Sequence, residues 1–92
     1  MQCQLCLREF SKLTLHHLIP RQYTRRKGIA TGPTIEICPG CHRQIHVLFS
    51  NQQLALELNS LEKLSQNPDM LKFLTWVRKQ QSNRRISVKR RR

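Results

Sequence analysis

The stretch that decides the fold is Cys38-Pro39-Gly40-Cys41-His42-Arg43-Gln44-Ile45-His46, in which a CxxC pair runs directly into two histidines at i and i+4. A CxxC turn offers two thiolates to one metal ion, and histidines at this spacing share a helix face, where both can reach a second ion. Upstream lie the partners that such sites need, namely Cys3, Cys6, His16 and His17. All the cysteines and histidines of the chain fall in these clusters. The pattern predicts two metal sites, one that holds the fold and one that does chemistry.

The cysteines predict a structural zinc site made by Cys3, Cys6, Cys38 and Cys41. The segment between the two pairs is long enough for two strands and a loop to return beside the first pair. Four thiolates close a tetrahedral zinc with no open position, so this site would be structural rather than catalytic. Two disulfides or free core cysteines are the alternatives. Doubled CxxC spacing without a secretory segment at residues 1–6 favours reduced thiolates in a cytoplasmic protein.

Size and charge narrow the class of protein. A chain of 92 residues that is 38% hydrophobic buries little core, and small domains often need a metal ion or a disulfide. Lysine and arginine number 17 against five acidic residues, a formal net charge of +12, which predicts a polyanionic partner, most simply nucleic acid. No apolar run approaches the length of a membrane span, and the basic tail has few large apolar residues. We therefore expect a soluble protein with no membrane association.

The pattern along the chain predicts a small α+β fold. Residues 1–10 form a first zinc knuckle, and two antiparallel strands follow at 13–19 and 34–37, separated by a loop over 22–33. Residues 38–41 form the second knuckle, and a helix begins near Cys41 and runs through Phe49. Residues 1–49 thus make up the core domain.

Residues 50–82 predict a helical extension that packs on this core. Ser50 or Asn51 caps a helix with leucines at i, i+4 and i+7, and the Asn-Pro step at 67–68 opens another helix. The leucine stripe is expected to pack on the second helix and the core, with dimerisation as the alternative. Residues 83–92 form a basic tail without acids.

The histidines form the candidate functional cluster. His42 and His46 share a helix face, whereas His16 and His17 are neighbours on a strand and point to opposite faces. One of the strand pair can therefore join the helix pair at an ion, which leaves the other imidazole free to take a proton from water. Three imidazoles suit zinc, nickel or cobalt, or Mg²⁺ and Mn²⁺ with a substrate phosphate completing the shell. The alternative is a nucleic-acid-binding finger whose histidines only form hydrogen bonds.

Two motifs, His16-His17-Leu18-Ile19-Pro20-Arg21 and the run at 38–46, resemble the HNH endonucleases. The resemblance covers residues 3–49 and is to small stand-alone members whose zinc knuckles frame a ββα-metal (His-Me finger) active site. It implies that His16 and His42 are metal ligands and His17 is the general base, while His46 matches a third histidine ligand found in the colicin-like branch. The central asparagine of the family has no counterpart between the two motifs, where Pro33 and Thr34 lie near its expected position.

Basic residues are the candidate nucleic-acid contacts. Arg21 and Arg43 adjoin the histidine motifs and are expected to reach the cleaved phosphate. On the loop between the strands, Arg25, Arg26 and Lys27 are expected to follow the nucleic-acid backbone. In the tail, Arg84, Arg85, Lys89 and Arg90 are expected to add salt-dependent, non-specific affinity. For each of them, a solvated charge without a binding role is the alternative.

The sequence therefore predicts a metal-dependent DNA endonuclease or nicking enzyme of the HNH class, a phosphodiester hydrolase. It would hold a structural Zn²⁺ and a catalytic Mg²⁺, Mn²⁺, Ni²⁺ or Zn²⁺. Double-stranded DNA is the expected substrate, with RNA left open, and a monomer is expected, with a protein partner as one route to targeting. The alternatives are a non-catalytic zinc-dependent nucleic-acid-binding module and a subunit that cuts only within a larger complex.

Overall fold

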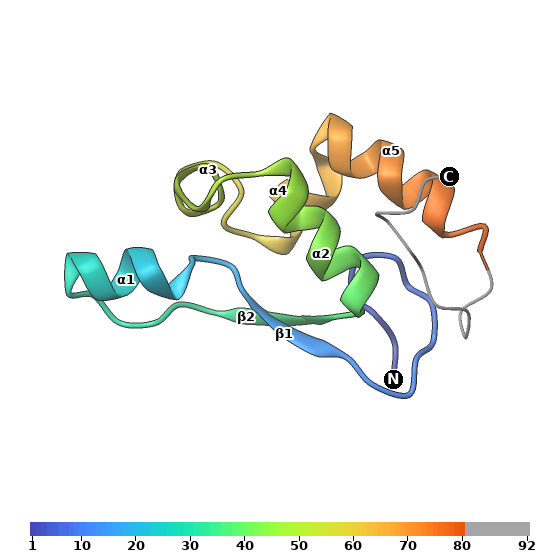
Figure 1. Cartoon of the computed structure of the whole chain (residues 1–92), viewed down its shortest axis with the longest axis horizontal. Coiled ribbons are helices and arrows are strands. Elements are labelled where there is room, and N and C mark those ends of the chain that lie inside the picture. The colour runs from blue at the N-terminus through green and yellow to red at the C-terminus, as the bar shows by residue number, and fades with distance from the viewer. Residues whose placement is uncertain (81–92) are drawn as a thin grey trace.

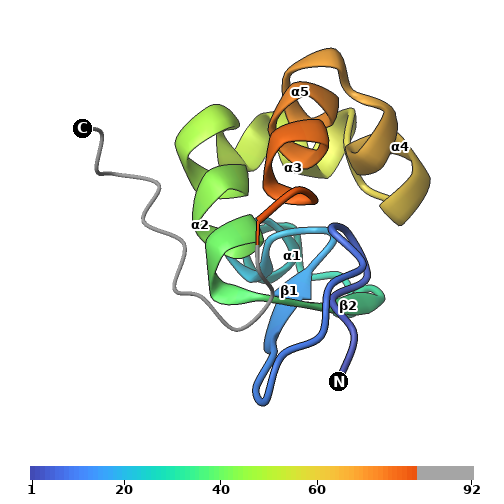
Figure 2. The same cartoon turned by 90° about the vertical axis from the view of Figure 1, so that its right-hand side faces the viewer.

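The computed structural model describes residues 1–80, which form a small α+β fold with a two-stranded sheet and several helices (Figure 1). Strands β1 (Thr14–His17) and β2 (Thr34–Ile37) pair in antiparallel register. The two predicted strands and their antiparallel pairing are confirmed, although the first is shorter than the predicted 13–19. Helices α2 to α5 lie on one side of the sheet, as two perpendicular views show (Figures 1 and 2). None of the described helices is long and apolar enough to cross a membrane.

The prediction that 22–33 is a loop throughout is wrong, because helix α1 (Arg21–Lys27) occupies its first half. The helix begins directly after Pro20, whose carbonyl accepts hydrogen bonds from the amides of Tyr23 and Thr24 at 2.9 and 3.1 Å. It ends at Gly28, which takes the left-handed conformation that glycine adopts without strain. Of its seven residues only Thr24 is buried, so no hydrophobic periodicity marks this helix in the sequence.

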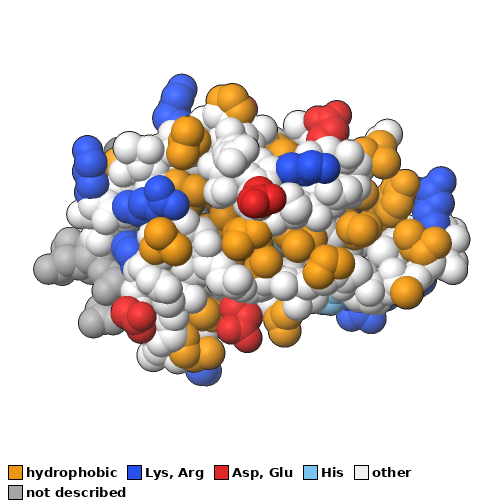
Figure 3. All heavy atoms as spheres, turned by 180° about the vertical axis from the view of Figure 1, so that it is seen from behind, with side chains coloured by type: hydrophobic (Ala, Val, Ile, Leu, Met, Phe, Trp, Pro, Cys, Tyr) orange, Lys and Arg blue, Asp and Glu red, His pale blue; other side chains and the backbone are white. Residues whose placement is uncertain are grey.

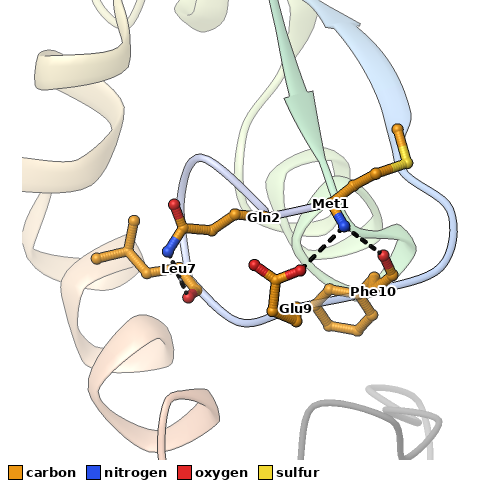
Figure 4. A network of polar contacts seen from close by, with 5 residues as sticks. All are labelled: Met1, Gln2, Leu7, Glu9 and Phe10. Atoms are coloured by element: carbon orange, nitrogen blue, oxygen red, sulfur yellow. Dashed lines mark hydrogen bonds and ion pairs between the residues drawn. The ribbon is translucent and has the colours of Figure 1, made fainter.

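The first knuckle is a closed loop at the start of the chain (Figure 4). An isolated bridge joins Gln2 to Glu9, and the amino group of Met1 donates to Oε1 of Glu9 and to the carbonyl of Phe10, each at 3.0 Å. The side chain of Gln2 spans the loop and donates to the carbonyl of Leu7 at 3.0 Å. These contacts fix the turn that carries the two N-terminal cysteines.

Helix α2 (Pro39–Leu48) begins earlier than the predicted start near Cys41. Cys38 is its N-cap, with Sγ accepting a hydrogen bond from the amide of Cys41 at 3.4 Å, and Pro39 takes the first helical position, which needs no amide donor. The second knuckle is therefore the first turn of α2. A metal ion held by these cysteines would also fix the N-terminus of the helix.

The predicted leucine stripe is divided between two short helices, α3 (Asn51–Leu56) and α4 (Leu61–Gln66). Ser50 caps α3, as predicted, and Ser60 caps α4 by accepting from the amide of Lys63 at 3.1 Å. The predicted helix start at 67–68 is confirmed, because Asn67 caps α5 (Pro68–Val77) through its side-chain oxygen. The serine at position 60 is the sequence signal that divides the stripe.

Helix α5 completes the core against α2 and α4. Three of its side chains, those of Met70, Leu74 and Val77, are fully buried in the same cluster as the cysteines. Just beyond the helix, Nη2 of Arg78 donates to the carbonyl of Leu5 at 2.8 Å. The C-terminal helix thus contacts the first knuckle directly.

We expect Leu74→Ala to lower the free energy of unfolding by about 2–5 kcal/mol, because it leaves a cavity in a fully buried site. Leu71→Ala on the exposed side of the same helix is the matched control and should cost less than about 0.5 kcal/mol. Chemical denaturation of the two variants measures both values. Equal losses would mean that α5 does not pack as described.

Candidate metal centres

The structure brings the four cysteines together in one buried cluster. Their Sγ atoms all lie within 4.8 Å of one another, with Cys3 to Cys41 at 3.8 Å and Cys6 to Cys38 at 3.9 Å. In a tetrahedral zinc site with Zn–S bonds of about 2.3 Å, the sulfur atoms lie about 3.8 Å apart. The Cys3–Cys41 and Cys6–Cys38 distances agree with this value. All four thiols are free and completely or almost completely buried. The cluster could therefore hold a metal ion such as zinc.

The electrostatics of the cluster also favour a cation. Hydrogen bonds with Cys38 and Cys41 lower the pKa of Cys3 to about 6, whereas hydrogen bonds with Cys3 and Cys38 raise the pKa of Cys41. A thiolate at Cys3 is thus stabilised by the neighbouring thiols, whereas a further thiolate at Cys41 is repelled by the negative charge already present. A bound dication would offset this repulsion. The buried Arg8 contributes as well, because its Nε donates to Sγ of Cys6 at 3.4 Å.

A second cluster contains three of the four histidines. His16 comes from β1, while His42 and His46 come from α2, one turn apart. One nitrogen of each ring can be chosen so that all three lie within 4.8 Å of one another, and the ring centroids are separated by 5.2 to 5.6 Å. Two elements that are far apart in the sequence thus present three imidazoles to one point, as the sequence predicts.

In the triad of His16, His42 and His46, burial favours the uncharged form of two members, His16 and His42. Burial first, and then the neighbouring imidazoles, lower the pKa of His16 to about 4, and the same causes lower the pKa of His42. Neutral imidazoles offer the lone pair that a metal ion needs. Nε2 of His16 is buried without a hydrogen-bond partner among residues 1–80, an arrangement that costs free energy unless something binds there. This nitrogen is the strongest sign that the triad could hold an ion.

A threonine fixes which nitrogen of His42 is free. Oγ1 of Thr14 lies 3.0 Å from the carbonyl of Ile37 and 2.8 Å from Nδ1 of His42. The hydroxyl has one proton, which it donates to the carbonyl, so it must accept from Nδ1–H of the histidine. The lone pair of His42 is then on Nε2. The period-2 alternation of β1 places Thr14 on the same face as His16, and this signal could have identified Thr14 from the sequence.

All four histidines line one open pocket of about 290 Å³. His17, which is partly exposed, and Arg21, at the start of α1, border it beside the triad. Gln22 and Asn51 complete the polar part of the wall, and Nδ2 of Asn51 donates to the side-chain oxygen Oε1 of Gln22 at 2.8 Å. The sequence motifs give no signal for this amide pair, because it forms only when α3 meets α1.

The predicted basic residues occupy different places. Arg21 borders the histidine pocket, whereas Arg26 and Lys27 line a neighbouring cavity. Arg25 and Arg43 are exposed and border neither cavity. The candidates in the basic tail, Arg84, Arg85, Lys89 and Arg90, lie outside the described residues.

The charged side chains that line the two cavities are all basic. The face in Figure 3 carries acidic side chains among hydrophobic and basic ones, and a histidine is visible only at its lower edge. Among residues 1–80, no acidic residue lines either cavity. Arg21 borders the histidine pocket, and Arg26 and Lys27 border the neighbouring cavity.

No protein-family model and no solved structure matches the chain. The chain is 40% identical, over 87 residues, to a Bacillus subtilis (strain 168) protein named "Uncharacterized protein YisB". The aligned region covers 95% of this chain and 83% of that relative. The chain belongs to the YisB family. The name of the relative states no activity. The chemistry of this YisB-family protein is therefore read from its cysteine and histidine clusters.

The cysteine cluster predicts a clear response to metal removal. We expect Cys6→Ser to lower the bound zinc to less than one ion per chain and to lower the thermal midpoint by more than 10 °C, because the binding energy of a structural ion is part of the folding energy. Elemental analysis and thermal denaturation measure the two effects. Ser65→Ala, which removes a hydroxyl that donates to the Glu62 carbonyl within α4, is the control and should leave both unchanged. Full zinc content in the cysteine variant would contradict the site.

We expect Thr14→Val to weaken metal binding at the triad by about 10- to 100-fold, because the hydrogen-bond partner of Nδ1 of His42 is lost. Calorimetric titration with Ni²⁺, in protein whose cysteine site is already filled with zinc, measures the affinity. Thr75→Val is the matched control, since Oγ1 of Thr75 bonds only within α5. Equal affinity in wild type and Thr14→Val would show that the hydroxyl does not orient the ring.

Proposed function

We propose that this protein is a metal-dependent phosphodiester hydrolase that acts on DNA, an endonuclease or nicking enzyme of the HNH class. The observation that carries the proposal is the convergence of His16, His42 and His46 on one point, with His17 in the same pocket. A purely structural ion has its ligands closed around it, whereas an ion held by these three imidazoles, which line the pocket, would keep at least one position for water or substrate. Three imidazole ligands with an open fourth position are found in catalytic zinc sites, and here a further imidazole and an arginine border the same pocket.

The order of elements supports a ββα-metal core. Strand β1 supplies His16 and His17, strand β2 pairs with it, and α2 supplies His42 and His46. Helix α1 is inserted between the two strands. We assign the cysteine cluster as the structural Zn²⁺ site that stabilises this core.

A divalent ion on the triad, whether Mg²⁺, Mn²⁺, Ni²⁺ or Zn²⁺, would polarise the scissile phosphate and stabilise charge on the leaving oxygen. The chain itself supplies the general base. His17 removes a proton from a water molecule, whose oxygen attacks phosphorus in line. The bond from phosphorus to the 3′-oxygen breaks, and that oxygen takes up a proton, which leaves 5′-phosphate and 3′-hydroxyl ends.

Arg21 has the second role in this proposal. It borders the pocket at the N-terminus of α1 and carries a fixed positive charge, so it can orient the phosphate and neutralise part of its charge. The remaining basic residues provide affinity without sequence recognition. We therefore propose a monomer with relaxed specificity, or one that a protein partner directs to its target. The reduced thiolates fit a cytoplasmic location.

One observation favours a second candidate, a non-catalytic zinc-dependent nucleic-acid-binding module. No asparagine lies between His17 and Cys38, and the residue opposite His17 in the sheet is Thr34. A binding module has no need for an unligated imidazole beside a metal site, so the position of His17 favours the nuclease.

We expect His17→Ala to lower the cleavage rate of supercoiled plasmid by about 10²–10⁴-fold, the usual contribution of a general base. Ni²⁺ titration of the same variant should show the triad still binding metal. Lys12→Ala, at an exposed position just before β1, is the control and should retain activity.

The assignment of His17 fails if His17→Ala cleaves as fast as wild type with any of the four ions. If the folded wild type binds DNA but cleaves with none of them, the binding module is the function. Linear and nicked products on the gel distinguish double-strand cleavage from nicking.

A further inference from the structure

A second cavity, of about 450 Å³, lies between α1 and α3, next to the histidine pocket. Gln22 and Asn51 border both cavities, so the two spaces meet at the hydrogen bond between these side chains. Cavities that bind small ligands measure about 300–1,000 Å³, so the second cavity has room for one nucleotide. A strand whose phosphate lies at the histidines would continue past this amide pair.

The second cavity has the chemistry of a nucleotide site. Tyr23 presents a partly buried ring, and Nζ of Lys27 lies 5.6 Å from its centroid. Arg26 adds another positive charge to the wall. An aromatic face stacks on a base, cations attract phosphate, and amides form hydrogen bonds with base edges. All three elements occur here within one cavity.

The same geometry argues against a paired base. In a duplex both faces of each base are covered by stacked neighbours, so an aromatic side chain reaches a base face only when the nucleotide is unstacked. The cavity is bordered by α1 on one side and by Asn51, Gln52 and Leu56 of α3 on the other. Its volume suits one extruded or single-stranded nucleotide.

From these observations we infer that the cavity between α1 and α3 binds an unpaired nucleotide adjacent to the cleaved phosphate, with Tyr23 stacking on its base. This inference rests on the proposed function and specifies its substrate class, a nucleic acid that is single-stranded at or beside the cut. Gln22 and Asn51 then connect the binding cavity to the reaction centre.

Fluorescence anisotropy tests the inference on the full, zinc-loaded chain without added divalent metal. The probes are a short labelled single-stranded DNA, its blunt duplex and an RNA strand of the same sequence, each checked afterwards on a denaturing gel for intact length. The single strand should bind at least fivefold more tightly than the duplex. Tyr23→Ala should raise its Kd by about tenfold, the loss expected for one stacked base, and Tyr23→Phe should restore binding. An equal loss with the RNA strand supports the same cavity and extends the substrate to RNA.

Two further variants keep the test decisive. Gln22→Ala changes an exposed side chain, so it should fold normally and weaken single-strand binding by about threefold through loss of a hydrogen bond. Trp76→Ala removes an exposed aromatic ring on α5 that borders neither cavity, and it should leave every Kd unchanged. If Trp76→Ala weakens binding as much as Tyr23→Ala, the ring contact is non-specific and the inference is overturned.

The results separate this inference from the proposed function. Single-strand binding that depends on Tyr23, without cleavage by any metal, would keep the nucleotide site and reject the nuclease. Cleavage of duplex DNA, with equal affinity for both forms and no effect of Tyr23→Ala, would keep the nuclease and reject the nucleotide site.

Discussion

Four buried sulfur atoms within 4.8 Å of one another are the constraint on which the rest of the structure depends. Such a cluster cannot ionise fully without a cation, and it joins two segments that are far apart in the sequence. One segment is the loop that begins the chain, and the other is the first turn of α2. The hydrogen bond from Arg78 to the carbonyl of Leu5 adds the end of α5 to the same junction. The arrangement of the elements around this small core therefore depends largely on the cysteine cluster.

The histidine cluster depends on that junction. Cys38 begins α2 and His42 lies on the next turn, with its amide donating to the Cys38 carbonyl at 3.0 Å. The knuckle anchors the first turn of α2, and the buried Ile45 packs the helix in the core between the two triad positions. The cysteine cluster and core packing together thus place His42 and His46 beside His16. We consider this the reason that so small a fold can bring three imidazoles together, with a fourth in the same pocket.

The parts of the fold that could be predicted are those with local signals. The CxxC pairs, the strand pair, the Asn67 cap and the i, i+4 histidines each follow from the chemistry of a few neighbouring residues. Helix α1 could not be predicted, because only Thr24 on it is buried and no apolar period results. The amide pair of Gln22 and Asn51 could not be predicted either, since it depends on tertiary packing between α1 and α3. The roles of the histidines as ligands and base stay predictions.

The hydroxyl of Thr14 has one more consequence. It connects the carbonyl of Ile37, the residue just before the knuckle, to the ring of His42 in the histidine cluster. The two candidate metal centres therefore share a short, continuous path of backbone and side chain. If each holds an ion, ordering one centre reduces the conformational freedom that the other must lose, and by thermodynamic linkage the effect is reciprocal. The protein would then take up its two ions cooperatively, with the affinity of each site set partly by the occupancy of the other.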